Sequence, residues 1–464
     1  MNLVSFSIKT KGLRNFLRRL WTVFSRFGFS ETRARRSLTA IVEALQSYQA
    51  APTFYIPAVV LRRHPVLMQT MVRNNVEISI HGYFHNDYRS LHEKEQYLQT
   101  RQAITIFDDV HIPWQGFRNP YLGWTEELLP ILNRLGFAYE SNETVHHDVV
   151  DLSQIPLPLQ EGYQKSLALY RALPANTSTL LPHFEGALLR IPLSIPDDEM
   201  LVDRLRMTRP NQVGGAWSDV MQRVYDLEGI YTLNLHPERG VLCRQALSML
   251  LAFAHSLPLP VWFARLEEVA RWWKERRAFR LDIQEQAHGC WHIVATCTAR
   301  ATLLARYLDA GQTATQPWTD SHVRVLAQDF LVRAPTCPCI AVSARTPCEV
   351  VDFLGEMGYP TRLIPEGEAG HYAYYLDMPE GLGTSRAEQA QKCGQLLEQI
   401  KQSNTPLVYF GPWPDGHYAA LSITGDIDSV TIQDFFLRIL EVSRTGIKLF
   451  ERGLTGQQNP NLAQ

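Results

Sequence analysis

Strand-like and helix-like segments alternate along roughly the first 275 residues of this chain, and this alternation limits its fold more than any other feature. Residues 53–60 (TFYIPAVV) and 76–80 are rich in β-branched and aromatic residues, whereas residues 31–49 and 91–107 have a helical pattern. Further strands are expected at 116–117, 186–191 and 230–235, and further helices at 65–74, 125–135 and 217–227. Strands that alternate with helices of about 10–15 residues predict an α/β fold with a parallel sheet or barrel.

The pattern changes after residue 277, and this change suggests the domain organisation. Residues 1–277 are expected to form the first domain, because the alternation ends there. Short, partly alternating runs such as AFRLDIQEQ predict a smaller α+β accessory region over residues 278–405. Residues 406–452 are expected to form a strand, an acidic loop and a helix, and the polar tail 453–464 is expected to be disordered.

Charge and composition limit which kinds of binding partner are expected for this chain. A net charge of -2 and a charged fraction of 20% argue against a nucleic-acid-binding protein. Lysines and arginines are nevertheless concentrated in residues 9–36, where Glu31 is the one acid. This stretch suits either an amphipathic helix on an anionic membrane surface or, as we favour, a barrel helix with a solvated basic face.

The expected setting is cytoplasmic. No run of 18 apolar residues predicts a transmembrane segment, and the first residues lack the apolar core of a signal peptide. The seven cysteines are odd in number and widely spread, which favours a reducing compartment.

Two histidine pairs have a spacing that suits a shared metal ion. His81 and His85, in IHGYFH, follow directly on an apolar strand, and an i, i+4 pair on a helical turn would direct both imidazoles the same way. His288 and His292 have the same spacing, but they lie in the accessory region and their motif contains no acid. We therefore favour His81 and His85 as metal ligands.

Other polar residues also follow apolar strands. Arg118, in GFRNPYLGW, offers a fixed cationic fork that could hold a carboxylate, and His236, in IYTLNLHPERG, is a candidate general acid. Asp197 and Asp198 follow the strand in LRIPLSIPDDE and could orient His236, pair with Arg118, or simply cap a helix.

Asp426 and Asp428, in ALSITGDIDS, follow a late strand and a glycine. Their alternate spacing would let one carboxylate bind metal while the other acts as a base. The competing interpretation is an aspartate-rich turn that caps the next helix.

Taken in order, these motifs resemble the polysaccharide deacetylase family (carbohydrate esterase family 4, the NodB-homology domain). PTFYIP, HGYFH, RNPY and LNLHPE carry the resemblance over roughly residues 1–240. It implies a distorted (β/α) barrel of about seven strands with its site at the strand ends. It also implies a divalent metal, usually zinc, held by one Asp and two His, with an adjacent Asp as base and the late His as acid. Neighbours of these motifs are expected to contact the substrate: Tyr83, Pro120, Tyr121 and Trp124.

One departure from the family pattern is serious. The family places its Asp-Asp or Asp-x-Asp motif at the end of the first strand, where this chain has SIKTKG, with Ser7, Lys9 and Thr10 and no acid. ALSITGDIDSVT is, however, very similar to such a first-strand motif. We therefore predict that the C-terminal strand–helix unit returns to the barrel in a circular-permutation-like arrangement. It would supply Asp426 as base and Asp428 as metal ligand.

The expected function is the metal-dependent hydrolysis of an N-acetyl group on a sugar of a polysaccharide or glycan precursor. Three alternatives stay open: an inactive deacetylase-like barrel that binds carbohydrate, a membrane-surface scaffold, and hydrolysis of a non-sugar amide by the same residues. The sequence does not determine the sugar, whether the acetyl group is on nitrogen or oxygen, or the oligomeric state.

Overall fold

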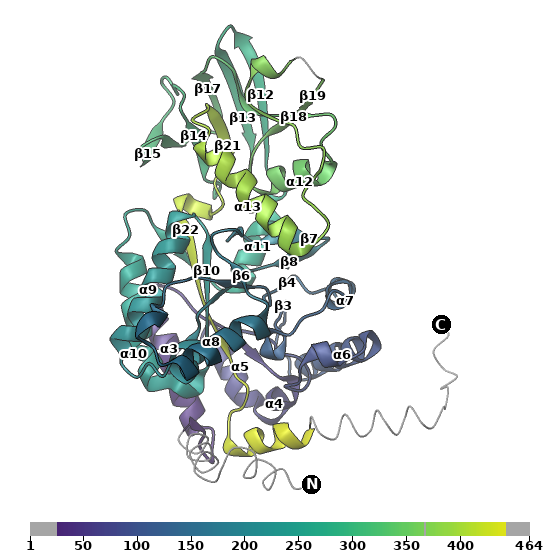
Figure 1. Ribbon diagram of the computed structural model, residues 1–464, viewed down its shortest axis with the longest axis vertical. Helices are drawn as coiled ribbons and strands as arrows, with labels where there is room; N and C mark the ends of the chain where they lie inside the picture. Colours follow the sequence, from purple (N-terminus) through teal and green to yellow (C-terminus); the bar gives the residue numbers. More distant parts are fainter. Residues whose placement is uncertain (1–25, 366–367, 442–464) are drawn as a thin grey trace, which may run out of the picture.

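The structure is a computed structural model, which describes residues 26–365 and 368–441 (Figure 1). The segment SIKTKG at the end of the expected first strand, most of the basic stretch and the tail 453–464 lie outside the described residues. The end of the basic stretch lies on helix α3 (Thr32–Gln46), where Arg33, Arg35 and Arg36 face solvent while Leu38 is buried. That pattern is typical of a helix with a solvated basic face.

A large, mostly parallel sheet forms the centre of the fold. Its strand order is β6-β5-β9-β10-β22-β1-β2-β3-β4-β8-β7, and β11 pairs with β22 to make twelve strands. The strands are β1 (Thr53–Ile56), β2 (Glu77–Ile80), β3 (Gly116–Phe117), β4 (Tyr139–Glu140), β5 (Thr144–His146), β6 (Leu173–Pro174), β7 (His183–Glu185), β8 (Leu188–Arg190), β9 (Leu193–Ile195), β10 (Ile230–Leu235), β11 (Val261–Phe263) and β22 (Ala419–Asp426). The α/β class and the distorted, curled barrel are thus confirmed.

Helices cover the outer side of this sheet (Figure 1). They are α3, α4 (Ala58–Arg63), α5 (Pro65–Arg73), α6 (Glu93–Asp109), α7 (Leu128–Leu135), α8 (Leu157–Tyr170), α9 (Pro210–Asp226), α10 (Gly240–His255) and α11 (Leu266–Arg276). Phe54, Ile78, Leu233 and Ile423 belong to the core cluster between sheet and helices. No helix in the part of the chain that the structure describes is long and apolar enough to cross a membrane.

The other side of the central strands is polar, because side chains alternate between the two faces of a strand. Glu77, Ser79 and then His81 follow one another on the inner side of β2 and its extension, and Thr424 and Asp426 do so on β22. These inner side chains contact each other across strands, for example Ser79 with Tyr139 of β4 and Arg118 with Thr424 of β22. The polar network inside the barrel therefore extends to the carboxyl ends of the strands.

β22 comes from the far end of the chain and lies between β1 and β10, parallel to both. All eight of its residues are buried. Gly425 is required at the contact, since a Cβ atom there would lie 2.9 Å from the ring of Phe54 and 3.3 Å from the carbonyl oxygen of Leu235. In Figure 1 the yellow strand runs through the sheet, so the returning strand is part of the barrel itself.

Residues 280–410 form three smaller sheets and two helices beside the barrel (Figure 1). The strands are β12 (Arg280–Ala287), β13 (Cys290–Thr296), β14 (Leu303–Arg306), β15 (Thr315–Thr319), β16 (His322–Val325), β17 (Asp329–Arg333), β18 (Cys337–Ser343), β19 (Thr361–Ile364), β20 (Tyr372–Leu376) and β21 (Leu407–Phe410). The helices are α12 (Cys348–Glu356) and α13 (Arg386–Gln402). Arg386 binds Glu126 and Glu185 of the barrel part, and β21 leads on toward β22.

Two local predictions were wrong. Residues 58–60, expected to belong to a strand over residues 53–60, begin α4, because Pro57 has no amide hydrogen for a ladder and starts the helix instead. His81 and His85 do not lie on a helical turn. Gly82 has a φ of 73°, which interrupts helical geometry, so the two histidines lie in a loop after β2.

Candidate active site

Polar residues from several strands meet at the carboxyl ends of the barrel strands. His81 follows β2, Arg118 follows β3, His236 follows β10, and Asp426 ends β22. They surround a pocket of about 390 Å³, which includes the solvent at its mouth. The residues that line it are His81, His85, Tyr121, Leu122, Tyr170, Asp197, Glu199, Asn234, His236, Asp426 and Asp428.

His81, His85 and Asp428 form a cluster that can hold a metal ion. Their ligand atoms lie within 4.8 Å of one another, and Asp428 Oδ1 is 3.0 Å from His85 Nε2 and 3.7 Å from His81 Nε2. Burial alone would raise the pKa of Asp428, but His85 and Arg438 hold it well below its usual range. Two imidazoles and one ionised carboxylate are a donor set that suits zinc.

The protonation state of His81 also suits a metal ligand. Its Nδ1 donates to the backbone oxygen of Arg118 at 2.9 Å, since a carbonyl can only accept, and this leaves the Nε2 lone pair for the cluster. Burial lowers the pKa of His81 to about 4, so the ring is neutral near pH 7. His81 Nε2 and Asp428 Oδ1 are buried and have no hydrogen-bond partner among the described residues. Such orphaned atoms in one small cluster fit a bound cation.

Asp426 is held in place beside this cluster. Its Oδ1 accepts from Arg118 Nη1 at 3.1 Å, and its Oδ2 accepts from Asn234 Nδ2 at 2.9 Å. The side chain of Arg118 is fully buried and its guanidinium lies 4.1 Å from the centre of the Tyr55 ring. Further donations to Ser141, Asn234 and Thr424 fix the orientation of this arginine. Arg118 therefore fixes the Asp426 carboxylate at the floor of the pocket.

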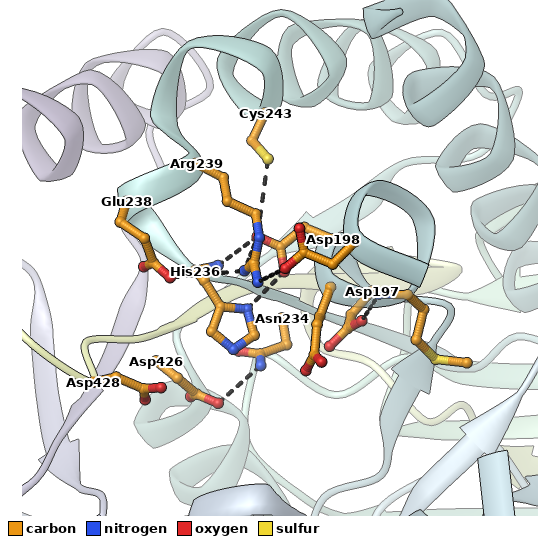
Figure 2. A network of polar contacts seen from close by, with 12 residues as sticks. Asp197, Asp198, Asn234, His236, Glu238, Arg239, Cys243, Asp426 and Asp428 are labelled. Atoms are coloured by element: carbon orange, nitrogen blue, oxygen red, sulfur yellow. Dashed lines mark hydrogen bonds and ion pairs between the residues drawn. The ribbon is translucent and has the colours of Figure 1, made fainter. Parts of the chain in front are cut away.

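His236 is held by Asp198 (Figure 2). Asp198 accepts from the backbone nitrogen and from Nδ1 of His236, each at 2.7 Å, and it also accepts from Arg239 at 3.2 Å. Burial alone would lower the pKa of His236, but the Asp198 charge holds it well above its usual value. The imidazolium Nε2 is left for a group in the pocket, on the side where Figure 2 places Asp426 and Asp428.

Asp197 has a different environment from Asp198. Its Oδ1 accepts from the backbone nitrogen of Met200 at 2.9 Å, as a residue at a helix start does. Burial and the neighbouring Asp198 charge raise the pKa of Asp197 to about 7. Neither aspartate pairs with Arg118, so of the alternatives drawn from the sequence Asp198 orients His236 and Asp197 caps the following turn.

The four residues expected to contact substrate are not gathered around the pocket. Tyr121 lines it, with its ring 4.7 Å from that of His85 and 46% of its surface exposed. Pro120 is buried, and Tyr83 packs against Phe84. Trp124 lies between the guanidinium groups of Arg190 and Arg386, at 4.4 and 5.1 Å, and does not line the pocket.

Three polar lining residues did not emerge from the sequence: Asn234, Tyr170 and Glu199. Asn234 could have been identified from the sequence, because a side-chain amide in the otherwise apolar strand IYTLNL needs a hydrogen-bond partner when it is buried. Tyr170, whose hydroxyl donates to Glu199 at 3.0 Å, comes from α8 and has no such local signal.

The second histidine pair, His288 and His292, lies on the β12–β13 hairpin. His292 pairs with Asp329 at 2.8 Å on the surface. Among the described residues, neither histidine belongs to a group of three metal-ligating side chains.

Comparison with known proteins places part of the chain in a family. The polysaccharide deacetylase profile matches residues 30–139. No curated protein sequence is significantly similar to the chain. Among solved structures, a protein described as a polysaccharide deacetylase from Mycobacterium smegmatis is 18% identical, with 57% of this chain and 82% of that chain covered and a TM-score of 0.39.

Two further solved structures are similar. A probable polysaccharide deacetylase from Pseudomonas aeruginosa is 21% identical, with 53% of this chain and 74% of that chain covered and a TM-score of 0.39. A pseudoenzyme of carbohydrate esterase family 4 from Bacillus anthracis is 17% identical, with 34% and 50% covered and a TM-score of 0.23. The family match supports a NodB-homology domain that includes residues 30–139 of this chain.

Proposed function

We propose that this protein is a metal-dependent hydrolase that removes the acetyl group from an N-acetylated sugar of a polysaccharide or glycan precursor. The proposal rests on one observation above all. Asp428, the acid that clusters with His81 and His85, directly follows the C-terminal strand β22, which ends at Asp426 and lies between β1 and β10. The arrangement thus combines a three-ligand cluster, a fixed carboxylate and a carboxylate-bound histidine around one pocket.

Each group has a role that its surroundings support. His81, His85 and Asp428 would hold a divalent ion, with zinc the best match to the ligands, and the ion would polarise the acetyl carbonyl. Asp426 would take a proton from the attacking water, because its carboxylate oxygens can each accept more than the one bond they have. His236 would give its Nε2 proton to the departing amine, a role that its raised pKa permits at neutral pH.

The experiment that tests this function combines metal content with turnover. The full chain is expressed, its zinc is counted by elemental analysis, and acetate release is measured from N-acetylated sugar oligomers. We expect near-stoichiometric zinc and acetate release, and we expect both to be lost in Asp428→Ala. Asp219→Ala, an exposed change on α9, is the matched control and should leave both unchanged.

Two outcomes would contradict the proposal. Glycan binding without zinc or acetate release would favour the inactive, carbohydrate-binding barrel. Zinc with acetate release from simple amides but not from sugars would favour the non-sugar substrate. A cytoplasmic location is part of the proposal, and the seven free cysteines support it, because reduced thiols persist in a reducing compartment.

A further inference from the structure

The segment that carries Asp428 continues into a helix over residues 432–441, and the start of this helix is firmly capped. Thr431 Oγ1 and its backbone nitrogen both donate to Asp434 Oδ2 at 2.9 Å, and Asp434 N donates to Thr431 Oγ1 at 3.3 Å. This reciprocal arrangement is a capping box, in which two orphan donors of the helix start are satisfied. The helix therefore begins at a fixed distance from Asp428.

The same Asp434 also ties the helix to α4. Its side chain is 1% exposed, and it binds Arg63 Nη1 at 2.7 Å through Oδ1 and His64 Nε2 at 2.8 Å through Oδ2. His64 Nδ1 in turn contacts Glu31 at 2.7 Å, and the ring of Phe435 packs 5.6 Å from that of Phe27. Ionised groups bonded in a partly buried position hold more strongly than exposed pairs do. The helix is thus fixed to a part of the chain about 370 residues earlier.

From this fixed helix, Arg438 reaches back to the metal cluster. Its Nη1 donates to Asp428 Oδ2 at 3.0 Å, and its guanidinium lies 5.1 Å from the centre of the Phe435 ring. Since Oδ2 is occupied, the other oxygen, Oδ1, is the one that faces His81 and His85. A carboxylate that is hydrogen-bonded on one oxygen presents the other in a single orientation.

We propose that Arg438 and Asp434 are positioning residues of the metal site: Asp434 fixes the C-terminal helix to α4, and Arg438 on that helix aims Asp428 at His81 and His85. This inference rests on the proposed function, because it assigns a supporting shell to the same cluster. These contacts explain how Asp428, which follows a strand from the far end of the chain, is held in a fixed orientation toward the two histidines. Neither residue contacts substrate in this account.

Electrostatic repulsion between Arg438 and a bound cation would change metal affinity in the opposite direction, so the two effects can be told apart by experiment. A guanidinium close to a divalent ion repels it, so an arginine whose charge mattered most would weaken metal binding. Loss of a residue that orients a ligand typically lowers metal affinity about 10–100-fold. The direction of change on removal of Arg438 therefore separates positioning from repulsion.

The test is a zinc titration of the full chain in competition with a chromophoric chelator. We expect Arg438→Met to bind zinc about 10–100-fold more weakly, and Arg438→Lys, which keeps one donor, to recover part of this loss. Arg101→Met, the same change on the exposed face of α6, is the control and should match the unmodified chain. The melting temperature of each metal-free variant, measured alongside, shows that the fold is retained.

Asp434→Asn provides a second, independent measurement. It removes the charge that Arg63 and His64 share, so zinc affinity should fall about 10-fold although Asp434 does not touch the cluster. Unchanged or tighter zinc binding in Arg438→Met and Asp434→Asn, with zinc in the unmodified chain, would overturn this inference and leave the proposed function intact. No zinc binding by the unmodified chain would overturn both.

Discussion

Asp198 binds His236 twice, through the backbone nitrogen and through ring Nδ1, both at 2.7 Å. The double contact fixes the direction of the ring and places a negative charge beside it. As a result the ring stays protonated near neutral pH and presents its Nε2 to the pocket. This relationship leads to the first prediction.

Asp198→Asn should lower the rate of deacetylation by about 10²–10⁴-fold, the usual worth of a proton-transfer group. The sign of its pH effect follows from the raised pKa of His236. The acid form is present below that pKa and is lost as pH rises through it, so removal of the Asp198 charge moves the alkaline limb to lower pH. A pH–rate profile of kcat/KM measures the shift, with Asp219→Asn as control. An unmoved alkaline limb would show that His236 is not the acid.

Arg118→Lys should destabilise the protein as well as reduce its activity. A lysine cannot reach Ser141, Asn234 and Asp426 together, and a buried carboxylate would lose its partner. The free energy of unfolding should fall by about 3–5 kcal/mol. Urea denaturation measures this loss, and Arg101→Lys should show none. An unchanged free energy of unfolding in Arg118→Lys would contradict this prediction, because it would mean that the hydrogen bonds of the guanidinium do not contribute to stability.

Glu77→Gln should change how stability depends on pH. Burial and the nearby Glu267 raise the pKa of Glu77 to about 7 from an ordinary value of 4.5. Between these values the folded state binds a proton that the unfolded state has lost, so stability falls as pH rises from 4.5 to about 7, by an amount on the order of 3 kcal/mol. The glutamine variant should lack this part of the slope. Urea titrations at several pH values test this, and identical slopes for the two proteins would contradict it.

Gly425→Ala should weaken the insertion of β22. The added methyl group would meet the Phe54 ring at 2.9 Å, and overpacking of this kind costs about 1–3 kcal/mol. Zinc content should fall with stability, because β22 leads directly to Asp428. Gly162→Ala in α8 is the matched control, since a Cβ there meets nothing within 4 Å and should stabilise the helix by about 0.5–1 kcal/mol. Equal changes in stability and zinc content for Gly425→Ala and Gly162→Ala would contradict this prediction.

Removal of metal should lower the melting temperature. A ligand that binds only the folded state stabilises it by about 2.7 kcal/mol at a free concentration 100 times its Kd. Calorimetry with and without a chelator should therefore show a drop that zinc reverses. The same scan on Asp428→Ala should show no response to either reagent, and an equal response would place the zinc elsewhere.

Several features of this protein were determined locally and could be predicted from its sequence. Residues 230–235 are mostly apolar, aromatic or β-branched and form β10 as expected, and the alternation of strands and helices indicates the α/β class. His81, Arg118 and His236 were identified because each stands directly after such a strand. The helical turn expected for His81 and His85 failed at one residue, Gly82, whose backbone conformation the sequence does not specify.

Tertiary structure alone decided how these residues are combined. The motif in residues 419–428 predicts a return to the barrel, but their place between β1 and β10 is set by hydrogen-bond ladders to residues about 370 and 190 positions earlier in the chain. The pairing of Asp198 with His236, the contact of Asn234 with Asp426, and the link from Asp434 to His64 arise in the same way. Local patterns fix which backbone segments form, because they depend on neighbours in sequence, whereas the partner of a buried charge depends on what the folded chain brings within about 3 Å.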